Sequence, residues 1–508
     1  MKRYGKWLPV VLFFSLLVVT CGGDNVAQAA ERKLKDTLRV TLLAEPGTLD
    51  PCMTGITVNQ QTTNQIFNQL VRVQSNGDIT PELAHKWERL DDLTIRFYLR
   101  EGVLFHNGDK MTAEDVAFSL GRLNWKGANT AMYSILDGAN TKVVDDYTID
   151  VKLTRPFAGV FHYLGNVNAG IVSKKYVEKE GEDINSRQPV GTGPFRFVEW
   201  KSGESILLER NENYWDAKPT FSKLILTFII EPTNRTIELE TGGTDIIFTV
   251  APSDVDRIRN NKNLKLLLAP GRRFTYITLN MSDPVFKDRR IREALHYAID
   301  MEALAEAVYG DMAVVADGII SPVYEAAWKP MKMIPYDPAK ARELLKEAVG
   351  GKLDITFKMN ENRQFIDVSE IVQNMWNAVG INVNLQVLEM ATFTAAGAAG
   401  EVQVGISSYA AASGYPGHQL QPWMTIFRGQ LQANDKKIDE LLLAASAEYD
   451  PVKRKELFGV ALDYMYNTLF YIPVVFNNVS YATRKNVENF EAHPGEMPEL
   501  RKVIIYEE

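Results

Sequence analysis

Cysteine is scarce in this chain, whose 508 residues contain only Cys21 and Cys52. A small scaffold stapled by disulfides is therefore excluded, as are Cys-x-x-Cys redox and zinc motifs. A chain of this length does not need disulfides, because it can bury a core large enough for stability. We expect Cys52 to be a small packed side chain rather than a reactive thiol.

Catalytic motifs are also missing. The six histidines are scattered and form no His-Glu-x-x-His zinc pair, and the chain has no Gly-x-Ser-x-Gly nucleophile elbow. The glycines of residues 191–193 lack the third glycine of a dinucleotide fingerprint. We therefore expect a protein that is not an enzyme and holds no metal or other cofactor, with a hydrolase as a distant alternative.

Positive charge is in the minority, since the formal net charge is −8. Nucleic acid is therefore not expected as a partner, because phosphate binding needs a basic face. The N-terminus is the exception: Lys2, Arg3 and Lys6 precede an apolar run over residues 8–19. That run is too short to span a bilayer and is typical of a secretory signal. No later stretch is long and apolar enough to be a membrane helix.

The leader offers two ends. Residues 18–22 resemble a lipoprotein box in which Cys21 would receive the lipid, although Thr20 departs from the usual small residue. Alternatively, cleavage follows Ala29, where Ala27 and Ala29 have the spacing of a signal-peptidase site, so that residues 1–29 form the signal peptide. Both versions predict an exported, periplasmic or extracytoplasmic protein whose only membrane contact is a possible lipid anchor.

Hydrophobic periodicity indicates an α/β fold. Alternating apolar residues predict strands, and apolar residues at helical spacing predict helices. A turn at Asp91-Asp92 predicts a hairpin, and Thr112 with Asp115 forms a capping pair for the helix that follows. The run 224–230, apolar apart from Thr227, predicts a strand buried on both faces. We expect strands over 37–43, 141–153, 195–200, 205–210, 224–230, 274–280, 353–359 and 381–387, and helices over 58–70, 233–241, 289–299, 368–379 and 437–469.

In the run from 81 to 123 the residue types themselves are informative, in addition to their hydrophobic periodicity. The run contains a set of residues in a fixed order: Pro81, Leu83, Ala84, Trp87, Leu99, Arg100, Gly102, Val103, Phe105, His106, Gly108, Thr112, Ala113, Glu114, Asp115, Val116, Phe118 and Ser119. This set closely resembles the signature of the bacterial extracellular solute-binding proteins of family 5, the dipeptide-, oligopeptide- and nickel-binding group, and the resemblance continues along nearly all of the chain after the leader.

The resemblance implies a periplasmic-binding-protein-like fold with mixed sheets flanked by helices. Two main lobes would enclose a ligand cleft, and the first lobe would contain an extra subdomain. Lobe I would comprise residues 38–80, 189–282 and 487–508, the inserted subdomain 81–188, and lobe II 283–486.

The resemblance also implies a function. The protein would be the monomeric substrate-binding component of an ABC importer, delivering a peptide or peptide-like solute to a permease whose ATPase is another chain. An oligosaccharide, an opine or a nickel chelate is the alternative solute. His418 could ligate a chelated metal, although a hydrogen-bonded histidine is the simpler expectation.

Residues 407–423 are the candidate ligand segment. In peptide binders of the family the corresponding run carries an aspartate that pairs with the α-ammonium of the peptide, and here Ala412 stands in its place. Tyr415 replaces a second acidic residue. Tyr409, Tyr415 and Trp423 could instead stack on a flat or sugar-like solute, or pack in the core.

Five other positions complete the candidate site. Arg363 follows a strand end, where it could pair with a solute carboxylate, and Arg272 and Arg273 are a second choice for that role. Glu45 lies in a turn that the resemblance places at the edge of the cleft, where it could substitute for the missing aspartate. Tyr276 belongs to the strand that leads out of lobe I.

Overall fold

The computed structural model describes residues 32–53, 55–125, 133–324, 331–411, 413–425 and 435–508. Its contacts define Leu34–Glu508 as one compact unit. Cys52 is buried there and its thiol donates to Asp50, so it is the packed side chain that its sequence context predicts.

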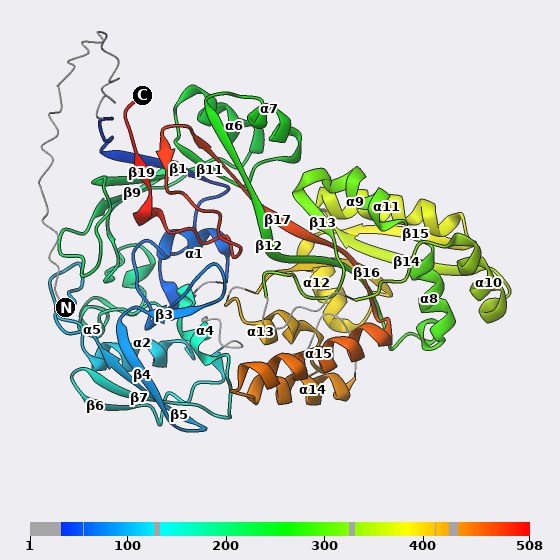
Figure 1. Cartoon of the computed structure of the whole chain (residues 1–508), viewed down its shortest axis with the longest axis horizontal. Coiled ribbons are helices and arrows are strands. Elements are labelled where there is room, and N and C mark those ends of the chain that lie inside the picture. Colours follow the sequence, from blue (N-terminus) through cyan, green and yellow to red (C-terminus); the bar gives the residue numbers. More distant parts are fainter. Residues whose placement is uncertain (1–31, 54, 126–132, 325–330, 412, 426–434) are drawn as a thin grey trace, which may run out of the picture. The chain divides into compact units, whose positions relative to one another are not determined.

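A mixed sheet of eleven strands, counted over the described residues, runs through this unit. Its two longest strands, β12 (Leu264–Leu279) and β17 (Tyr471–Arg484), lie side by side and antiparallel (Figure 1). Strands from both predicted lobes join these two, in the order β15-β14-β16-β12-β17-β11-β1-β10-β9-β8, with β13 beside β17. The other strands are β1 (Thr37–Leu42), β8 (Phe195–Lys201), β9 (Ser205–Arg210), β10 (Lys223–Phe228), β11 (Ile246–Phe248), β13 (Ala313–Val315), β14 (Leu353–Asn360), β15 (Ile381–Leu388) and β16 (Val404–Tyr409).

The predicted βαβ unit is present. Strands β14 and β15 pair in parallel and are connected by α11 (Arg363–Asn377), whose apolar face includes the buried Trp376. Aspartates begin three nearby helices by accepting backbone N–H groups that no helical carbonyl can reach. These helices are α8 (Arg289–Tyr297), α9 (Met301–Tyr309) and α10 (Pro338–Val349). Helix α12 (Met390–Ala399) follows β15.

A separate four-stranded sheet has the order β4-β5-β7-β6. It contains the predicted hairpin, β4 (Ala84–Asp91) and β5 (Thr94–Leu99), and a second hairpin, β6 (Lys142–Asp145) and β7 (Thr148–Lys152). Helix α2 (Ala113–Arg122) begins at the expected cap, where the carboxylate of Asp115 accepts the amide of Thr112 at 2.9 Å. Arg122 at the end of α2 forms a buried ion pair with Asp50 at 2.5 Å, which fixes the loop after β1.

The helix predicted over 58–70 is shorter than expected. Helix α1 covers only Thr57–Thr63. The carbonyls of Gln65 and Ile66 accept Phe195 and Gly193 instead of continuing the helix. Gly191 and Gly193 lie so close to the Ile66 carbonyl that a side chain at either position would overlap it. A contact between residues far apart in sequence therefore ends the helix, and local periodicity carries no signal for it.

Strand β10 differs from the prediction that both of its faces are buried. Leu224 and Leu226 are buried, but Ile225, Thr227 and Phe228 are only half-buried, and Ile230 beyond the strand is 81% exposed. Only one face of β10 is therefore fully covered. An apolar run alone does not distinguish one covered face from two.

The remaining elements include the helices that cover the rest of the unit. They are α4 (Val160–Leu164), α5 (Lys174–Glu180), α6 (Pro232–Thr241), α7 (Val255–Arg259), α13 (Pro416–Leu420), α14 (Lys436–Ala447) and α15 (Pro451–Thr468), with the short strands β2 (Val71–Val73), β3 (Ile79–Pro81), β18 (Val487–Glu488) and β19 (Ile504–Ile505).

One hydrophobic cluster joins residues of the 81–188 segment to residues of the 415–476 segment. Tyr415 packs edge-on against Phe157 with ring centroids 5.2 Å apart. The amide of Ala158 donates to the carbonyl of Ser446 at 2.8 Å, and Gln421 donates to the hydroxyl of Tyr163 at 2.8 Å. In this conformation the predicted inserted subdomain and the predicted second lobe are therefore packed directly against each other.

Candidate functional site

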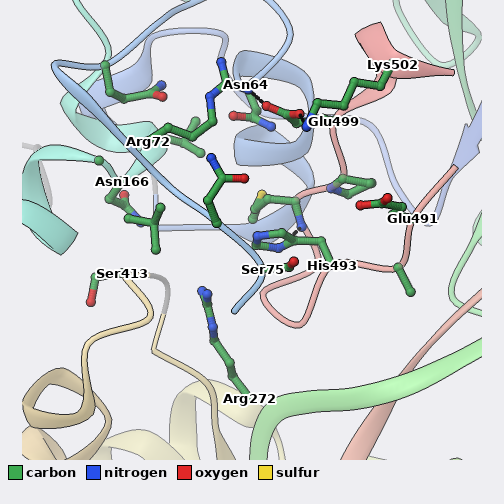
Figure 2. A pocket seen from close by; sticks show the side chains of 18 of the residues that line it. Asn64, Arg72, Ser75, Asn166, Arg272, Ser413, Glu491, His493, Glu499 and Lys502 are labelled. Atoms are coloured by element: carbon green, nitrogen blue, oxygen red, sulfur yellow. Dashed lines mark hydrogen bonds and ion pairs between the residues drawn. The ribbon is translucent and has the colours of Figure 1, made fainter. Parts of the chain in front are cut away.

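A polar cavity of about 100 Å³ lies where segments far apart in sequence meet. We call it the Arg272 cavity. Its walls come from residues 64–75, residues 165–167, Arg272 on β12, Ser413, and residues 489–502 near the C-terminus (Figure 2). Amide, hydroxyl, imidazole and charged groups line it, so a polar solute can exchange its water contacts for protein contacts here.

Arg272 reaches the cavity because of an irregularity in β12. The register between β12 and β17 shifts between Pro270 and Phe274, and Arg272 lies within this bulge. A bulge redirects a side chain that regular pleating would place elsewhere. The amide of Arg272 donates to the carbonyl of Pro494 at 3.1 Å, and its guanidinium end extends into the cavity between Ser75 and Ser413 (Figure 2).

Two glycines make room for the Arg272 guanidinium. A Cβ at Gly414 would lie 2.6 Å from Nη2, and one at Gly495 would overlap Nη1. Gly414 also has φ of +71°, which favours glycine. Arg272 is only 5% exposed, and burial lowers the pKa of its guanidinium. The structure thus places a cation in a slot that larger residues would close.

The histidines around Arg272 are held neutral. Burial, with a smaller contribution from the charge of Arg272, lowers the pKa of His493 to about 3 and that of His418 to about 4. His493 accepts the amides of Gly495 and Met497 through Nδ1, at 3.1 and 3.3 Å. Nδ1 of His418 is 2.8 Å from the hydroxyl oxygen of Ser413. Both rings therefore act as neutral hydrogen-bonding groups at pH 7.

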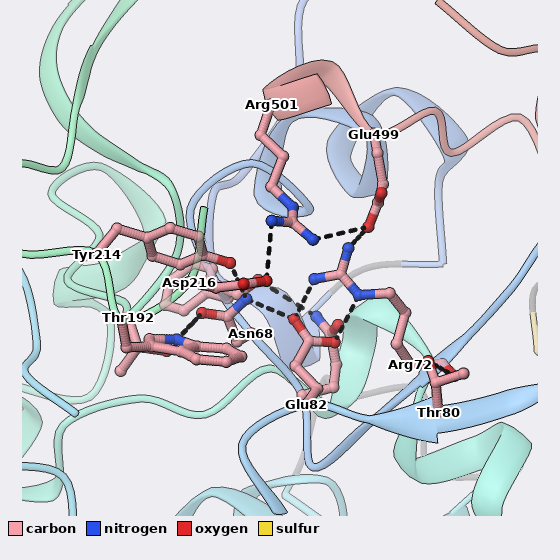
Figure 3. A network of polar contacts seen from close by, with 12 residues as sticks. Asn68, Arg72, Thr80, Glu82, Thr192, Tyr214, Asp216, Glu499 and Arg501 are labelled. Atoms are coloured by element: carbon pink, nitrogen blue, oxygen red, sulfur yellow. Dashed lines mark hydrogen bonds and ion pairs between the residues drawn. The ribbon is translucent and has the colours of Figure 1, made fainter. Parts of the chain in front are cut away.

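An ionic network connects one wall of the cavity to the C-terminal segment. Arg72 pairs with Glu82 at 2.5 Å and also with Glu499 (Figure 3). Glu499 pairs in addition with Lys502 at 2.5 Å and with Arg501 at 3.8 Å. Residues 489–502 are thereby tied to the β2–β3 region, and both contribute to the cavity lining.

The aromatic residues predicted for the site lie in the packed interior. Tyr276 is 3% exposed and Trp423 1% exposed, with ring centroids 5.4 Å apart. Tyr415 is 2% exposed, whereas Tyr409 is half-buried at the end of β16, edge-on to His418. These four residues do not belong to the lining of the Arg272 cavity, and their contact with a solute stays a prediction.

The charged candidates are separated by the fold. Glu45 accepts hydrogen bonds from Trp200, Ser202 and Gly203 at 2.7 to 3.0 Å. Although partial burial acts to raise the pKa of Glu45, these bonds lower it. Arg363 is exposed at the start of α11 and pairs with Asp367 at 2.5 Å. Arg273 pairs with Glu496 at 3.4 Å, so of the three arginines considered only Arg272 lines the cavity. Ala412 and Cys21 lie outside the described residues.

Sequence reasoning missed the walls formed by residues 64–75 and 489–502. One signal was available in the uninterrupted polar, uncharged run of residues 59–65, nearly all of which is buried. Buried amides need partners, and here they reach distant backbone and side chains. Gln60 donates to Asn168 at 2.7 Å, and Gln61 donates to the carbonyl of Glu496 at 3.0 Å.

Within the described residues, no group of three or more His, Cys, Asp or Glu side chains is arranged to hold a metal ion. The helices of the same part of the chain include none with the length and apolar character needed to cross a bilayer.

Comparison with known proteins identifies the family. Residues 78–429 match the description "Bacterial extracellular solute-binding proteins, family 5 Middle". This match includes the signature run discussed above and covers more than half of the chain.

Two relatives and one solved structure extend the match. Glutathione-binding protein GsiB of Salmonella paratyphi A is 28% identical over 466 residues, covering 88% of this chain and 90% of the relative. Heme-binding protein A of Haemophilus influenzae is 29% identical over 460 residues, covering 83% of each. The structure of HbpA2 from Haemophilus parasuis matches with a TM-score of 0.84 and 25% identity, covering 93% of this chain and 100% of that one. The mixed sheet, the capped signature helix and these matches agree, and the chain belongs to the bacterial extracellular solute-binding proteins of family 5.

Proposed function

We propose that this protein captures a peptide-like solute in the Arg272 cavity and delivers it to the permease of an ABC importer. It acts outside the cytoplasm as a monomer and leaves the covalent bonds of the solute intact. Export uses the N-terminal leader, which either ends before a lipidated Cys21 or is removed after Ala29.

The single observation that carries the proposal is the composition of the cavity walls. Segments from the first, middle and last parts of the chain meet there, so the cavity exists only when they are brought together. About 100 Å³ holds a few waters or one small chemical group. A whole peptide needs a larger space. The solute therefore enters when the 81–188 and 415–476 segments separate, and their contacts re-form around it.

The relatives support a polar, carboxylate-bearing solute. Glutathione and heme, named for the two relatives above, differ in shape, but both carry carboxylates. A buried guanidinium suits that shared group. A nickel chelate or an opine would have to use the same cavity, and both remain alternatives to be compared in the same assay.

Substituting Ser75 with Trp tests whether the Arg272 cavity is the binding site. Ser75 is exposed and lines the cavity, so an indole there should occupy the space without disturbing the core. We expect glutathione, small peptides, nickel–histidine or an opine to raise the melting temperature of the wild-type protein, because a ligand that binds only the native state stabilises it. Ser75→Trp should weaken binding of that solute at least tenfold in isothermal titration calorimetry.

The matched control is Ser282→Trp, which places the same indole on an exposed loop outside the cavity lining. It should bind like the wild type. Equal weakening by both variants, or none by Ser75→Trp, would place the binding site elsewhere. Mass spectrometry of the recovered solute checks that it is unchanged, and turnover would favour a hydrolase instead.

A further inference from the structure

The geometry points to Arg272 as the anchor for a carboxylate of the bound solute. The protein would then select solutes by an anionic end rather than by a free amino end. This inference rests on the proposed function and specifies the chemistry of the same cavity.

The Arg272 side chain is held in place by its surroundings. The guanidinium lies against Gly414 and Gly495, each of which would clash with it if it carried a Cβ. Its amide is fixed to Pro494, and the bulge in β12 directs the side chain into the cavity. An arginine whose rotamers are restricted in this way is prepared to form paired hydrogen bonds with a planar carboxylate, since little side-chain entropy remains to be lost.

The charges around the cavity favour an anion. Arg72 and Lys502 also line it, together with the carboxylates of Glu491 and Glu499, and Glu499 is shared among Arg72, Arg501 and Lys502. The nearby histidines are neutral, partly because of the Arg272 charge itself. With Arg272 the lining carries three cations against two carboxylates, so an incoming carboxylate meets a net positive charge, which an ammonium group would not favour.

The segment that faces Arg272 lacks acidic residues. Ser413 and Gly414 belong to a stretch, residues 402–434, that contains no aspartate or glutamate. The segment therefore has no carboxylate of its own to hold a solute ammonium. It offers a small residue on which the guanidinium rests and a hydroxyl that is engaged by His418.

Three versions of one tripeptide library distinguish recognition of the carboxyl end from recognition of the amino end. The versions have free ends, an acetylated amino end, or an amidated carboxyl end, and each is assayed by thermal shift and then by calorimetry on the purified protein. We expect the free and acetylated versions to bind and the amidated version to bind about 10- to 100-fold more weakly, because a charge-assisted pair is lost.

Substitutions at Arg272 test whether this residue causes the weaker binding of amidated peptides. Arg272→Gln should weaken binding of the free library by a similar factor and remove the discrimination against amidation. The matched control Arg259→Gln changes an exposed arginine outside the lining and should bind like the wild type. Gly495→Ala keeps the Arg272 charge but displaces Nη1, and should weaken binding even if Arg272→Gln does not fold.

The outcomes separate the inference from the function on which it rests. If amidated peptides bind as well as free ones, or if acetylation removes binding, the anchor is not a carboxylate, while the proposed function stands. If Arg272→Gln folds and retains the discrimination, another residue is the anchor. If no version of the library stabilises the wild type, the peptide-binding function itself is overturned.

Discussion

Individual residues acquire their roles in this protein from the partners they meet, and Glu45 and Arg272 illustrate this. Both are charged and both were candidates from sequence. Glu45 is used locally, because its carboxylate accepts three hydrogen bonds from the β8–β9 hairpin. Arg272 extends into a cavity whose other walls come from distant segments. In both cases the residue type indicates only a charged side chain, and the surroundings distinguish the local hydrogen bonding of Glu45 from the binding role that we propose for Arg272.

Glu45→Ala provides a prediction at this scale. Removing the carboxylate leaves Trp200 without its acceptor, whereas the exposed Ser202 and Gly203 can bind water instead, so we expect the free energy of unfolding to fall by about 0.5–1.5 kcal/mol in urea denaturation. Solute affinity should stay within about twofold of the wild type. Glu199→Ala, at an exposed position of the same hairpin, is the control and should change neither quantity. A large loss of affinity with unchanged stability would mean that Glu45 contacts the solute.

Secondary-structure elements bring these residues together. Strand β12 carries Arg272, and the network around Glu499 holds the C-terminal segment against the β2–β3 region. Asn68 in the same region donates to Glu82 at 2.5 Å, and Trp215 donates to Asn68 at 3.2 Å, so the network also includes neutral groups (Figure 3). Such a network links three segments that share no local sequence pattern, and two of them are walls of the cavity.

Glu499→Gln tests this connection. Arg72, Arg501 and Lys502 would lose a shared anion, and we expect a loss of about 1–3 kcal/mol in unfolding free energy, since Glu499 is partly buried. Hydrogen exchange followed by mass spectrometry should show faster exchange in residues 489–503 and 64–75 than in the rest of the chain. Glu491→Gln changes an exposed carboxylate of the same segment and should leave exchange unaltered. Equally faster hydrogen exchange in all parts of the protein would argue that the Glu499 network does not stabilise these two segments locally.

The whole molecule responds to pH through buried histidines. Burial is the main cause that lowers the pKa values of five histidines in the described chain. The pKa is about 4 for two of them and about 3 for the other three, which are, respectively, His106 and His418, and His162, His296 and His493. The unfolded chain takes up protons near pH 6.5, whereas the native protein does not until the pH is far lower. Stability from this source is therefore complete above about pH 6.5 and falls as the pH drops toward 4.

His418→Gln gives the corresponding measurement. The variant has one fewer group that binds a proton only in the unfolded state, so its unfolding free energy should depend less steeply on pH, by about 1.4 kcal/mol per pH unit between about pH 6 and 4.5. Urea denaturation at several pH values, without solute, provides the slopes. Gln188→Asn, which changes no ionisable group at an exposed position, should leave the slope close to that of the wild type. An unchanged slope in His418→Gln would show that His418 is charged in the native state.

Much of the architecture follows from the sequence because it depends on neighbours along the chain. The β4–β5 hairpin, the Thr112–Asp115 cap and the parallel β14–α11–β15 unit are all confirmed. Each is encoded by alternation, by a capping residue or by a turn, which act over a few positions. The signature run that identified the family lies in the same region, and the family assignment is also confirmed.

The candidate site depends on contacts between residues far apart in sequence, which hydrophobic periodicity does not predict. The ranking of the three arginines stays a prediction, but of the three only Arg272 lines the cavity, because the bulge in β12 directs it inward. The early end of α1 has the same origin, a glycine segment from residues 191–193 that occupies its continuation. The sequence by itself determined the elements and the family, through short-range patterns. Only the tertiary structure decided which charge lies in the cavity, because packing between remote segments sets where a side chain points.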